Sequence, residues 1–359
     1  MATHFRVGTE SKSLCPCLLD KTPGQGPHLR IPHIVVKLVS QRGWLNNADL
    51  ARRLPGSSLV HGDIEFATEE KNAADVVVIQ NYLRYDTELS ARSGFIWKWD
   101  NQPIVNDSID RGYDRVFAHF GIDDPRVTTA PPILDWWVGK GYDELLDCEI
   151  PEKAKNVSAI ASTKDWITGH RMRGEFVQRA AREFPGLELF GRGREREIDD
   201  KWDGLASYRY SLAIENTSKD NYWTEMISDC FLSYTVPFYF GATNISQCFP
   251  EDSFIWLPID RPDDALDIMR NTLATDNWEA RLPELQEARL RVLENYSLFA
   301  QLTRLVNDNR EAILSAPIVA KKVKGRCTKP GGWIRGAGVM GNLRARLERR
   351  KARQLSTSK

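Results

Sequence analysis

Short apolar segments rich in β-branched residues recur along the chain and predict buried strands. In the first half they are HIVVKLVSQ (33–41), SSLVHG, ADVVVIQNY (74–82), GFIWKWDN (94–101) and YDRVFAHFG (113–121). The segment NNADLARRLP begins with helix-capping residue types and ends in proline, so it predicts a helix after the first strand. Strands that alternate with short helices predict an α/β fold with a mostly parallel sheet.

The same alternation starts again after EIPEKAKN (149–156). Predicted strands follow at VSAIAS (157–162), YRYSLAIEN (208–216), VPFYFG (236–241) and SFIWL (253–257), and GHRMRGEFVQRAAREF (169–184) predicts an amphipathic helix. A chain of 359 residues also exceeds the ~250–300 residues at which one core stops growing. We therefore expect a flexible segment over 1–30, α/β domains over 31–150 and 151–315, and a tail over 316–359.

Charge is distributed unevenly along a chain whose formal net charge is zero. Thirteen Lys and Arg residues and one acid, Glu348, follow residue 315, so the tail carries 13 − 1 = +12 and the preceding residues carry −12. Leu343 and Leu347 would share a helix face ringed by arginine, which favours peripheral contact with an anionic membrane. A solvated, partly disordered end is the alternative, and the acidic body argues against a nucleic-acid partner.

The six cysteines are scattered, and their spacing favours neither a disulfide framework nor a structural zinc site. No stretch approaches the ~20 apolar residues of a membrane span, and the first 30 residues lack the apolar core of a signal peptide. These features predict a cytoplasmic protein, in peripheral contact with the inner face of the membrane if the tail binds there, with no metal site.

Polar residues gather where the predicted strand 208–216 meets the next helix. The strand would deliver Glu215 and Asn216 to the carboxyl edge of the sheet, and the helix that follows Tyr222 would point its backbone N–H groups at the same place. A diphosphate would be attracted there, and Glu225 could accept hydrogen bonds from sugar hydroxyls. The alternative is an ordinary turn followed by a first-turn acid that the helix dipole favours.

Residues 208–257, YRYSLAIENTSKDNYWTEMISDCFLSYTVPFYFGATNISQCFPEDSFIWL, resemble the donor-binding motif of glycosyltransferase family 10, the α-1,3-fucosyltransferases. That motif runs through Glu-Asn, a short loop, Tyr-x-Thr-Glu-Lys, a helix and Pro-x-x-x-Gly. The matching residues are Tyr208, Arg209, Leu212, Glu215, Asn216, Tyr222, Thr224, Glu225, Pro237, Gly241, Phe249 and Phe254. A weaker likeness extends upstream to about residue 75.

The resemblance implies a GT-B-type fold, with two Rossmann-like domains and an active site in the cleft between them. It implies an inverting enzyme that transfers L-fucose from GDP-fucose to a hydroxyl of a glycan acceptor. No cofactor would be required, and Mg²⁺ or Mn²⁺ would at most stimulate the transfer reaction. Asn216, Tyr222 and Glu225 would line the donor pocket, and Arg173, with Arg171 as the alternative, would clamp the diphosphate.

One position departs from the family's motif: Met226 stands where the family has a lysine that faces the donor phosphates. Either a nearby cation substitutes, with Arg192, Arg194 and Lys219 as the candidates, or donor affinity is weaker, or the donor differs. The alternative function is therefore a catalytically weak or donor-switched homologue that binds another nucleotide sugar or a glycan.

Inverting transfer also needs a carboxylate that removes the acceptor proton. The resemblance places this general base at Asp100 in WKWDNQP, with Glu88 and Asp86 in reserve. The alternative is that Asp100 is only a turn residue after a strand.

Overall fold

A computed structural model describes residues 33–40, 46–68, 74–100, 109–119, 121, 123–132, 136–163, 165 and 168–327. The strands are β1 (Ile34–Ser40), β2 (Val60–His61), β3 (Ile64–Ala67), β4 (Val76–Gln80), β5 (Thr87–Arg92), β6 (Ile96–Asp100), β7 (Arg115–Ala118), β8 (Val127–Thr129), β9 (Lys155–Ile160), β10 (Leu187–Phe190), β11 (Tyr208–Ile214), β12 (Val236–Phe240), β13 (Ile255–Trp256) and β14 (Ile318–Val323). The α-helices are α1 (Asn47–Ala51), α2 (Tyr142–Leu146), α3 (Thr168–Glu183), α4 (Glu225–Leu232), α5 (Pro262–Thr275), α6 (Leu282–Arg291), α7 (Leu298–Asp308) and α8 (Arg310–Ser315).

The first sheet has the order β2-β3-β1-β4-β6-β7-β8 and is parallel except for β2, which runs antiparallel to β3. Both faces of its central strands are buried. In β4, Val76 and Val78 belong to one apolar cluster, whereas Val77 and Ile79 belong to another. Burial on both faces explains the continuous apolar segments that the sequence shows here. The mixed α/β class expected from the sequence is confirmed.

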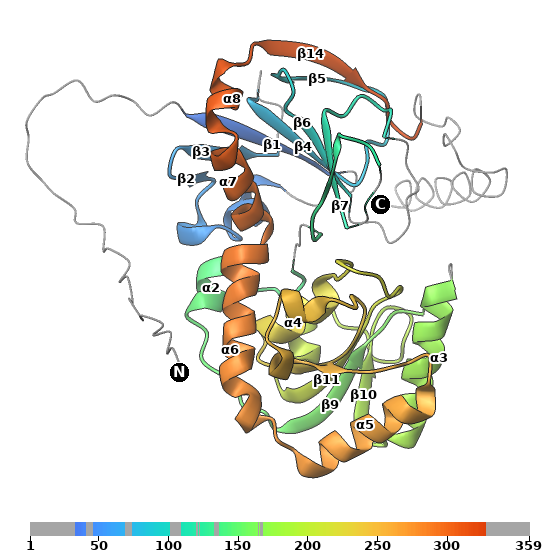
Figure 1. Cartoon of the computed structure of the whole chain (residues 1–359). Helices are drawn as coiled ribbons and strands as arrows, with labels where there is room; N and C mark the ends of the chain where they lie inside the picture. The colour runs from blue at the N-terminus through green and yellow to red at the C-terminus, as the bar shows by residue number, and fades with distance from the viewer. Residues whose placement is uncertain are drawn as a thin grey trace, which may run out of the picture. The chain divides into compact units, whose positions relative to one another are not determined.

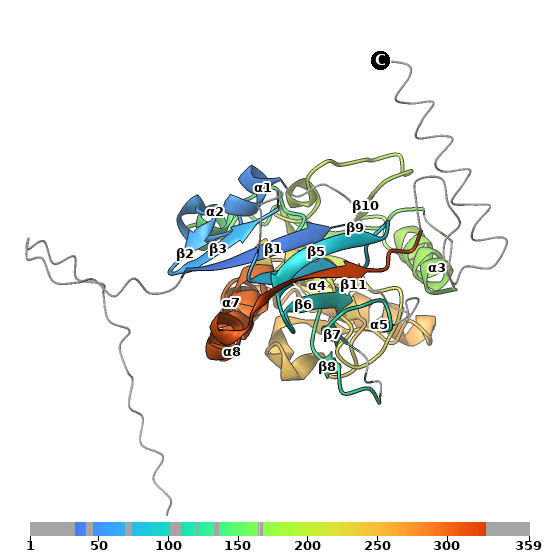
Figure 2. The same ribbon diagram turned by 90° about the horizontal axis from the view of Figure 1, so that it is seen from above.

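The end of the described chain packs against this first sheet (Figures 1 and 2). Helices α7 and α8 contribute Leu302 and Ile313 to the apolar cluster on one face of the sheet. Strand β14 pairs antiparallel with β5, and its Val323 joins the cluster on the other face. Residues 298–323 therefore pack with the first half, unlike the sequence-based division, because apolar periodicity shows that a face is buried but not which sheet covers it.

The second sheet has the order β10-β9-β11-β12-β13 and is parallel throughout. Its core includes one buried side chain from each of α3, α4, α5 and α6: Phe176, Ile227, Leu266 and Leu285. β11 lies at the centre of the sheet, between β9 and β12. The loop after β11 therefore begins at the middle of the carboxyl edge, where ligands of parallel sheets usually bind.

Helix α4 is capped at both ends. At its start, the Thr224 hydroxyl accepts a hydrogen bond from the Met226 N–H at 3.3 Å. At its end, Lys153 Nζ donates to the Ser233 carbonyl at 2.8 Å, and Arg289 Nε donates to the Leu232 carbonyl at 3.4 Å. Cations at the carboxyl end complement the helix dipole, so both ends of α4 are stabilised in the orientation that points its positive end toward the loop after β11.

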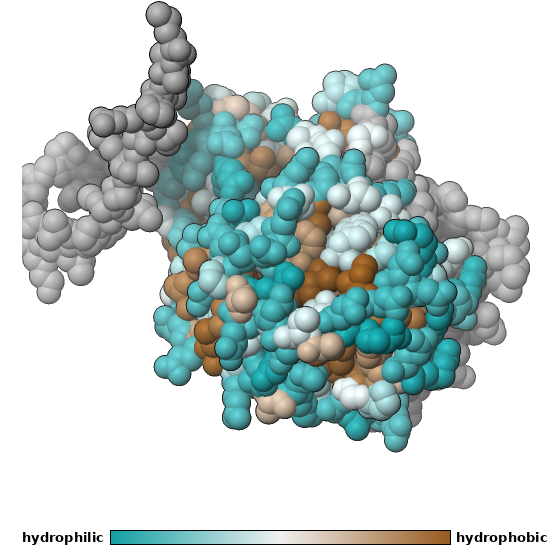
Figure 3. All heavy atoms as spheres, turned by 60° about the horizontal axis from the view of Figure 1, so that its bottom comes forward, coloured by the Kyte–Doolittle hydropathy of each residue, from teal (hydrophilic) through white to brown (hydrophobic). Residues whose placement is uncertain are grey.

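Within the described segments, no helix is long and apolar enough to cross a membrane. The face drawn in Figure 3 is mainly hydrophilic (teal), with apolar residues (brown) gathered in a few small areas. Residues 328–359, which include Leu343 and Leu347 of the predicted membrane-binding tail, lie outside the described residues, as do Cys15 and Cys17. The other four cysteines are free thiols: Cys148, Cys230, Cys248 and Cys327.

Candidate functional site at the carboxyl edge of the second sheet

The residue after β11, Glu215, ties the loop 216–223 to the start of α4. Its carboxylate accepts hydrogen bonds from the Thr224 N–H at 2.7 Å and from the Thr224 hydroxyl at 2.9 Å. The side chain is only 2% exposed. Burial raises the pKa of Glu215 to about 8, and the nearby Glu225 carboxylate adds to the rise. Glu215 is therefore a buried residue whose hydrogen bonds hold the loop 216–223 against the start of α4.

Two of the predicted donor-binding residues contact each other in this loop. The Tyr222 hydroxyl donates to Asn216 Oδ1 at 3.1 Å, and Asn216 Nδ2 lies 3.3 Å from His170 Nε2 in the first turn of α3. The backbones also approach closely, since a Cβ atom on Gly169 would lie 1.6 Å from the Asn216 carbonyl oxygen. The start of α3 and the loop 216–223 therefore lie against each other, and only glycine fits at position 169.

The two candidate diphosphate clamps of α3 differ in direction. Arg173 Nη1 lies 3.5 Å from the Ile214 carbonyl oxygen, at the end of β11. Arg171 is exposed, and its Nη2 lies 3.3 Å from the Thr168 hydroxyl of the same helix. Of the two, the structure brings Arg173 to the carboxyl edge of the sheet beside the loop.

The three cations expected to compensate for Met226 are spread around the edge. Arg194 Nε donates to the Ala161 carbonyl at 3.0 Å, just past β9, and burial lowers its pKa. Arg192 and Lys219 are exposed. No ion pair found among the described residues joins any of the three to Glu225. Met226 itself packs against the apolar core of the second half.

A different lysine contacts the first turn of α4, and the sequence analysis missed it. Lys201 Nζ lies 3.5 Å from Glu225 Oε1 and 2.8 Å from Asp229 Oδ2. Burial alone would lower the pKa of Lys201, but the Asp229 and Glu225 carboxylates outweigh it and raise that pKa above its ordinary value. Lys201 belongs to a short 3-10 helix, Lys201–Gly204, and nothing in its local sequence points to α4.

Asp100, the candidate general base, is the last residue of β6 and is 2% exposed. Its carboxylate forms an ion pair with Lys98 at 2.9 Å, and the two residues lie on the same face of the strand. The two reserve candidates lie at the β5–β14 pair instead. Asp86 accepts a hydrogen bond from the Gly325 N–H at 3.0 Å, and Glu88 is paired with Lys322 in the strand register.

His119 is the second residue that the sequence analysis missed. It follows β7, and Ala118 before it is the strand partner of Asp100. Its ring centroid lies 4.7 Å from that of Tyr222, so this side chain of the first half contacts the loop 216–223. Burial, with a contribution from Lys219, lowers the pKa of His119 to about 4, and the ring is therefore neutral at pH 7.

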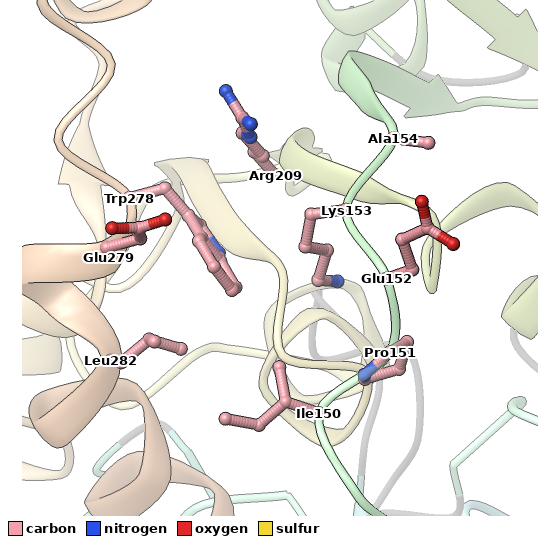
Figure 4. A pocket seen from close by; sticks show the side chains of 9 residues that line it. All are labelled: Ile150, Pro151, Glu152, Lys153, Ala154, Arg209, Trp278, Glu279 and Leu282. Carbon is pink, nitrogen blue, oxygen red and sulfur yellow. The ribbon is translucent and has the colours of Figure 1, made fainter.

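A cavity of about 670 Å³ lies elsewhere, at the amino ends of the strands of the second sheet. Its lining includes Lys153 and Ala154, which precede β9, and Arg209 near the start of β11. Figure 4 shows Lys153 and Trp278 on neighbouring sides of it, and Lys153 Nζ lies 5.9 Å from the centroid of the Trp278 ring. The hydrogen bonds of Lys153 to the end of α4 account for its position. In the part of the chain that the structure describes, no group of three or more His, Cys, Asp and Glu side chains is arranged to hold a metal ion.

The similarity to known proteins is found in the region that contains the second sheet and α4. The family model for the carboxyl-terminal part of glycosyltransferase family 10 (fucosyltransferase) matches residues 150–260. The chain is 30% identical over 105 residues to the α-(1,3)-fucosyltransferase FucT of Helicobacter pylori, which covers 29% of this chain and 22% of that protein. It is 36% identical over 66 residues to an α-(1,4)-fucosyltransferase of Arabidopsis thaliana, covering 17% of this chain and 16% of that one. The matches thus span less than a quarter of either relative.

Among solved structures, an α1,3-fucosyltransferase with GDP-fucose aligns over 84% of this chain and 95% of that chain, at 18% identity and a TM-score of 0.48. The family match covers β9 to β13, the loop after β11 and α4, and so includes Asn216, Tyr222 and Glu225. Residues 150–260 of this chain are a glycosyltransferase family 10 (fucosyltransferase) C-terminal domain.

Proposed function

We propose that this protein is an inverting glycosyltransferase of the GT-B type, which transfers L-fucose from GDP-fucose to a hydroxyl of a glycan acceptor. The observation that carries the proposal is the junction between β11 and α4. There Asn216, Tyr222 and Glu225 gather at the carboxyl edge of a parallel sheet, within the family 10 domain. Two separate parallel sheets, as a GT-B enzyme requires, are consistent with it.

In this proposal the diphosphate of the donor binds at the amino end of α4. The positive end of the helix dipole attracts it, and Arg173 supplies a charge-assisted hydrogen bond from the neighbouring helix. The Asn216 amide and the Glu225 carboxylate offer a donor and acceptors to ribose and fucose hydroxyls. The Tyr222 hydroxyl holds the Asn216 side chain in the required direction.

The proposed reaction forms one bond and breaks one at the anomeric carbon of fucose. The acceptor oxygen attacks, its proton passes to the Asp100 carboxylate, and the bond to the phosphate oxygen breaks with its electrons leaving on GDP. The Lys98 ammonium lies 2.9 Å from the Asp100 carboxylate and fixes its position on β6. The dipole of α4 and Arg173 stabilise the departing diphosphate.

Isothermal titration with GDP-fucose, GDP-mannose and UDP-glucose tests the donor. We expect GDP-fucose to bind wild type, Glu225→Ala and Arg173→Ala to weaken binding by about tenfold to a hundredfold, and Arg171→Ala to change it by less than about threefold. Binding of UDP-glucose alone would favour the donor-switched alternative. If none of the three nucleotide sugars binds, the proposal is refuted.

Turnover of GDP-fucose by Asp100→Asn tests the base. Loss of a general base lowers kcat by about a hundredfold or more while leaving donor affinity unchanged. Asp100→Asn removes the carboxylate that forms an ion pair with the buried Lys98. Lys98→Met with Asp100→Asn therefore serves as the folding control, and thermal unfolding is measured for both. Wild-type kcat in a folded variant would remove Asp100 from the mechanism.

A further inference from the structure

Two carboxylates and one lysine form a cluster on one face of α4, next to the proposed donor site. Glu225 and Asp229 are one helical turn apart, and Lys201 contacts both, at 3.5 Å and 2.8 Å. The cluster is open at one end, since the side chain of Asp229 is 1% exposed whereas that of Glu225 is 31% exposed. Asp229 is further engaged because its Oδ1 accepts a hydrogen bond from the Trp137 N–H at 3.0 Å.

The charges of this cluster decide whether an anion can approach the amino end of α4. Without a cation, a diphosphate would meet two carboxylates within the first two turns, against about half a positive charge from the helix dipole. Position 226 contributes no charge, since Met226 packs against the apolar core. Lys201 offsets one of the two negative charges and holds the partly exposed Glu225 carboxylate.

The position of Lys201 is fixed from outside α4. The preceding residue, Asp200, caps the 3-10 helix Lys201–Gly204 by accepting a hydrogen bond from the Trp202 N–H at 2.8 Å. The same carboxylate oxygen accepts one from the Gly139 N–H at 2.8 Å. Both bonds restrict the backbone from which the Lys201 side chain extends, so its ammonium group is held beside α4 before any ligand binds.

We propose that Lys201 is a positioning residue of the donor site, which holds the Glu225 carboxylate and supplies the positive charge that position 226 lacks. The proposal rests on the proposed function, since it assumes that a nucleoside diphosphate binds at α4. The cation then comes from the 3-10 helix Lys201–Gly204, 25 positions before Met226 in the sequence (226 − 201), and not from α4 itself. A lysine introduced at position 226 should therefore make Lys201 dispensable.

Titration with GDP of a matched set of variants tests this. Lys201→Met alone leaves Asp229 buried and unpaired, which can unfold the domain, so Lys201→Met is combined with Asp229→Asn. This pair leaves the net charge of the cluster unchanged, so its effect reports the loss of the ammonium group that holds the Glu225 carboxylate. We expect the pair to raise the Kd for GDP by about tenfold to a hundredfold, and Lys201→Arg by less. Adding Met226→Lys should restore the Kd to within about threefold of wild type. Lys324→Met, at an exposed lysine next to β14, is the control and should leave the Kd unchanged.

The outcomes separate the two proposals. If the folded pair of substitutions binds GDP as wild type does, or if Met226→Lys restores nothing, the role of Lys201 is refuted while the glycosyltransferase stands. A lowered Tm with an unchanged Kd also refutes it, because a purely structural lysine would behave in that way. If wild type binds UDP and not GDP, the fucose donor is refuted, and the same variants titrated with UDP decide on Lys201. If it binds no nucleoside diphosphate, both proposals are refuted.

Discussion

The buried Glu215 carboxyl group makes the stability of the protein depend on pH in a predictable direction. Its pKa is about 8 in the folded chain, against an ordinary value of 4.5 that also applies after unfolding. Between these two values the unfolded chain releases this proton and the folded chain keeps it. Glu215 therefore contributes stability that is fully present below pH 4.5 and is lost as the pH rises toward 8.

The substitution Glu215→Gln isolates this effect, because glutamine keeps an acceptor for the Thr224 N–H and carries no proton to lose. At about 1.4 kcal/mol per pKa unit, linkage predicts that wild type loses about 3 to 4 kcal/mol of unfolding free energy relative to Glu215→Gln between pH 5 and pH 8. At pH 5 the two proteins should differ by less than about 1.5 kcal/mol, the contribution of one hydrogen bond.

Urea unfolding followed by tryptophan fluorescence, at pH 5, 6, 7 and 8, measures this difference. Other titrating groups act on both proteins and cancel in the comparison. Glu175→Gln, at an exposed acid of α3, is the matched control and should follow wild type at every pH. Parallel pH profiles for wild type and Glu215→Gln would show that Glu215 does not retain its proton in the folded chain, and would refute the reasoning.

Three further predictions concern two contacts around the site and the C-terminal tail. Gly169→Ala should abolish GDP binding or lower the Tm by several degrees, because its Cβ would overlap the backbone of Asn216. The control Gly174→Ala, in the same helix, meets no atom within 4 Å and should be neutral or stabilising. GDP titration and thermal unfolding compare the two variants. His119→Ala should raise the KM for GDP-fucose by about three- to tenfold and His119→Phe by less, since a ring keeps the contact with Tyr222; equal effects would contradict this. Truncation after Cys327 should keep the fold and lose binding to vesicles of anionic phospholipid. Truncation after Leu314 also removes β14 and should destabilise the protein. Vesicle binding that is retained after the Cys327 truncation would refute a membrane role of the tail.

The site was predictable from the sequence as far as its parts are neighbours along the chain. The end of β11, the loop and the start of α4 lie within one short stretch, so local patterning and the family's motif placed Asn216 and Tyr222 together, as the structure does. The choice between Arg171 and Arg173 was not local. Side chains two positions apart on a helix point in very different directions. Only the packing of α3 on the sheet decides which of the two arginines reaches the edge.

By itself, the sequence determined the α/β class, the mostly parallel sheets and the polar composition of the loop 216–223, because strand burial and helix capping depend on short-range patterns. Only the tertiary structure decided that Lys201 meets Glu225, that His119 meets Tyr222, and that α7, α8 and β14 cover the first sheet. Each of these contacts joins segments far apart in the chain. An apolar or charged face shows that a partner is required, but the partner is chosen by the packing of whole elements, which no single segment encodes.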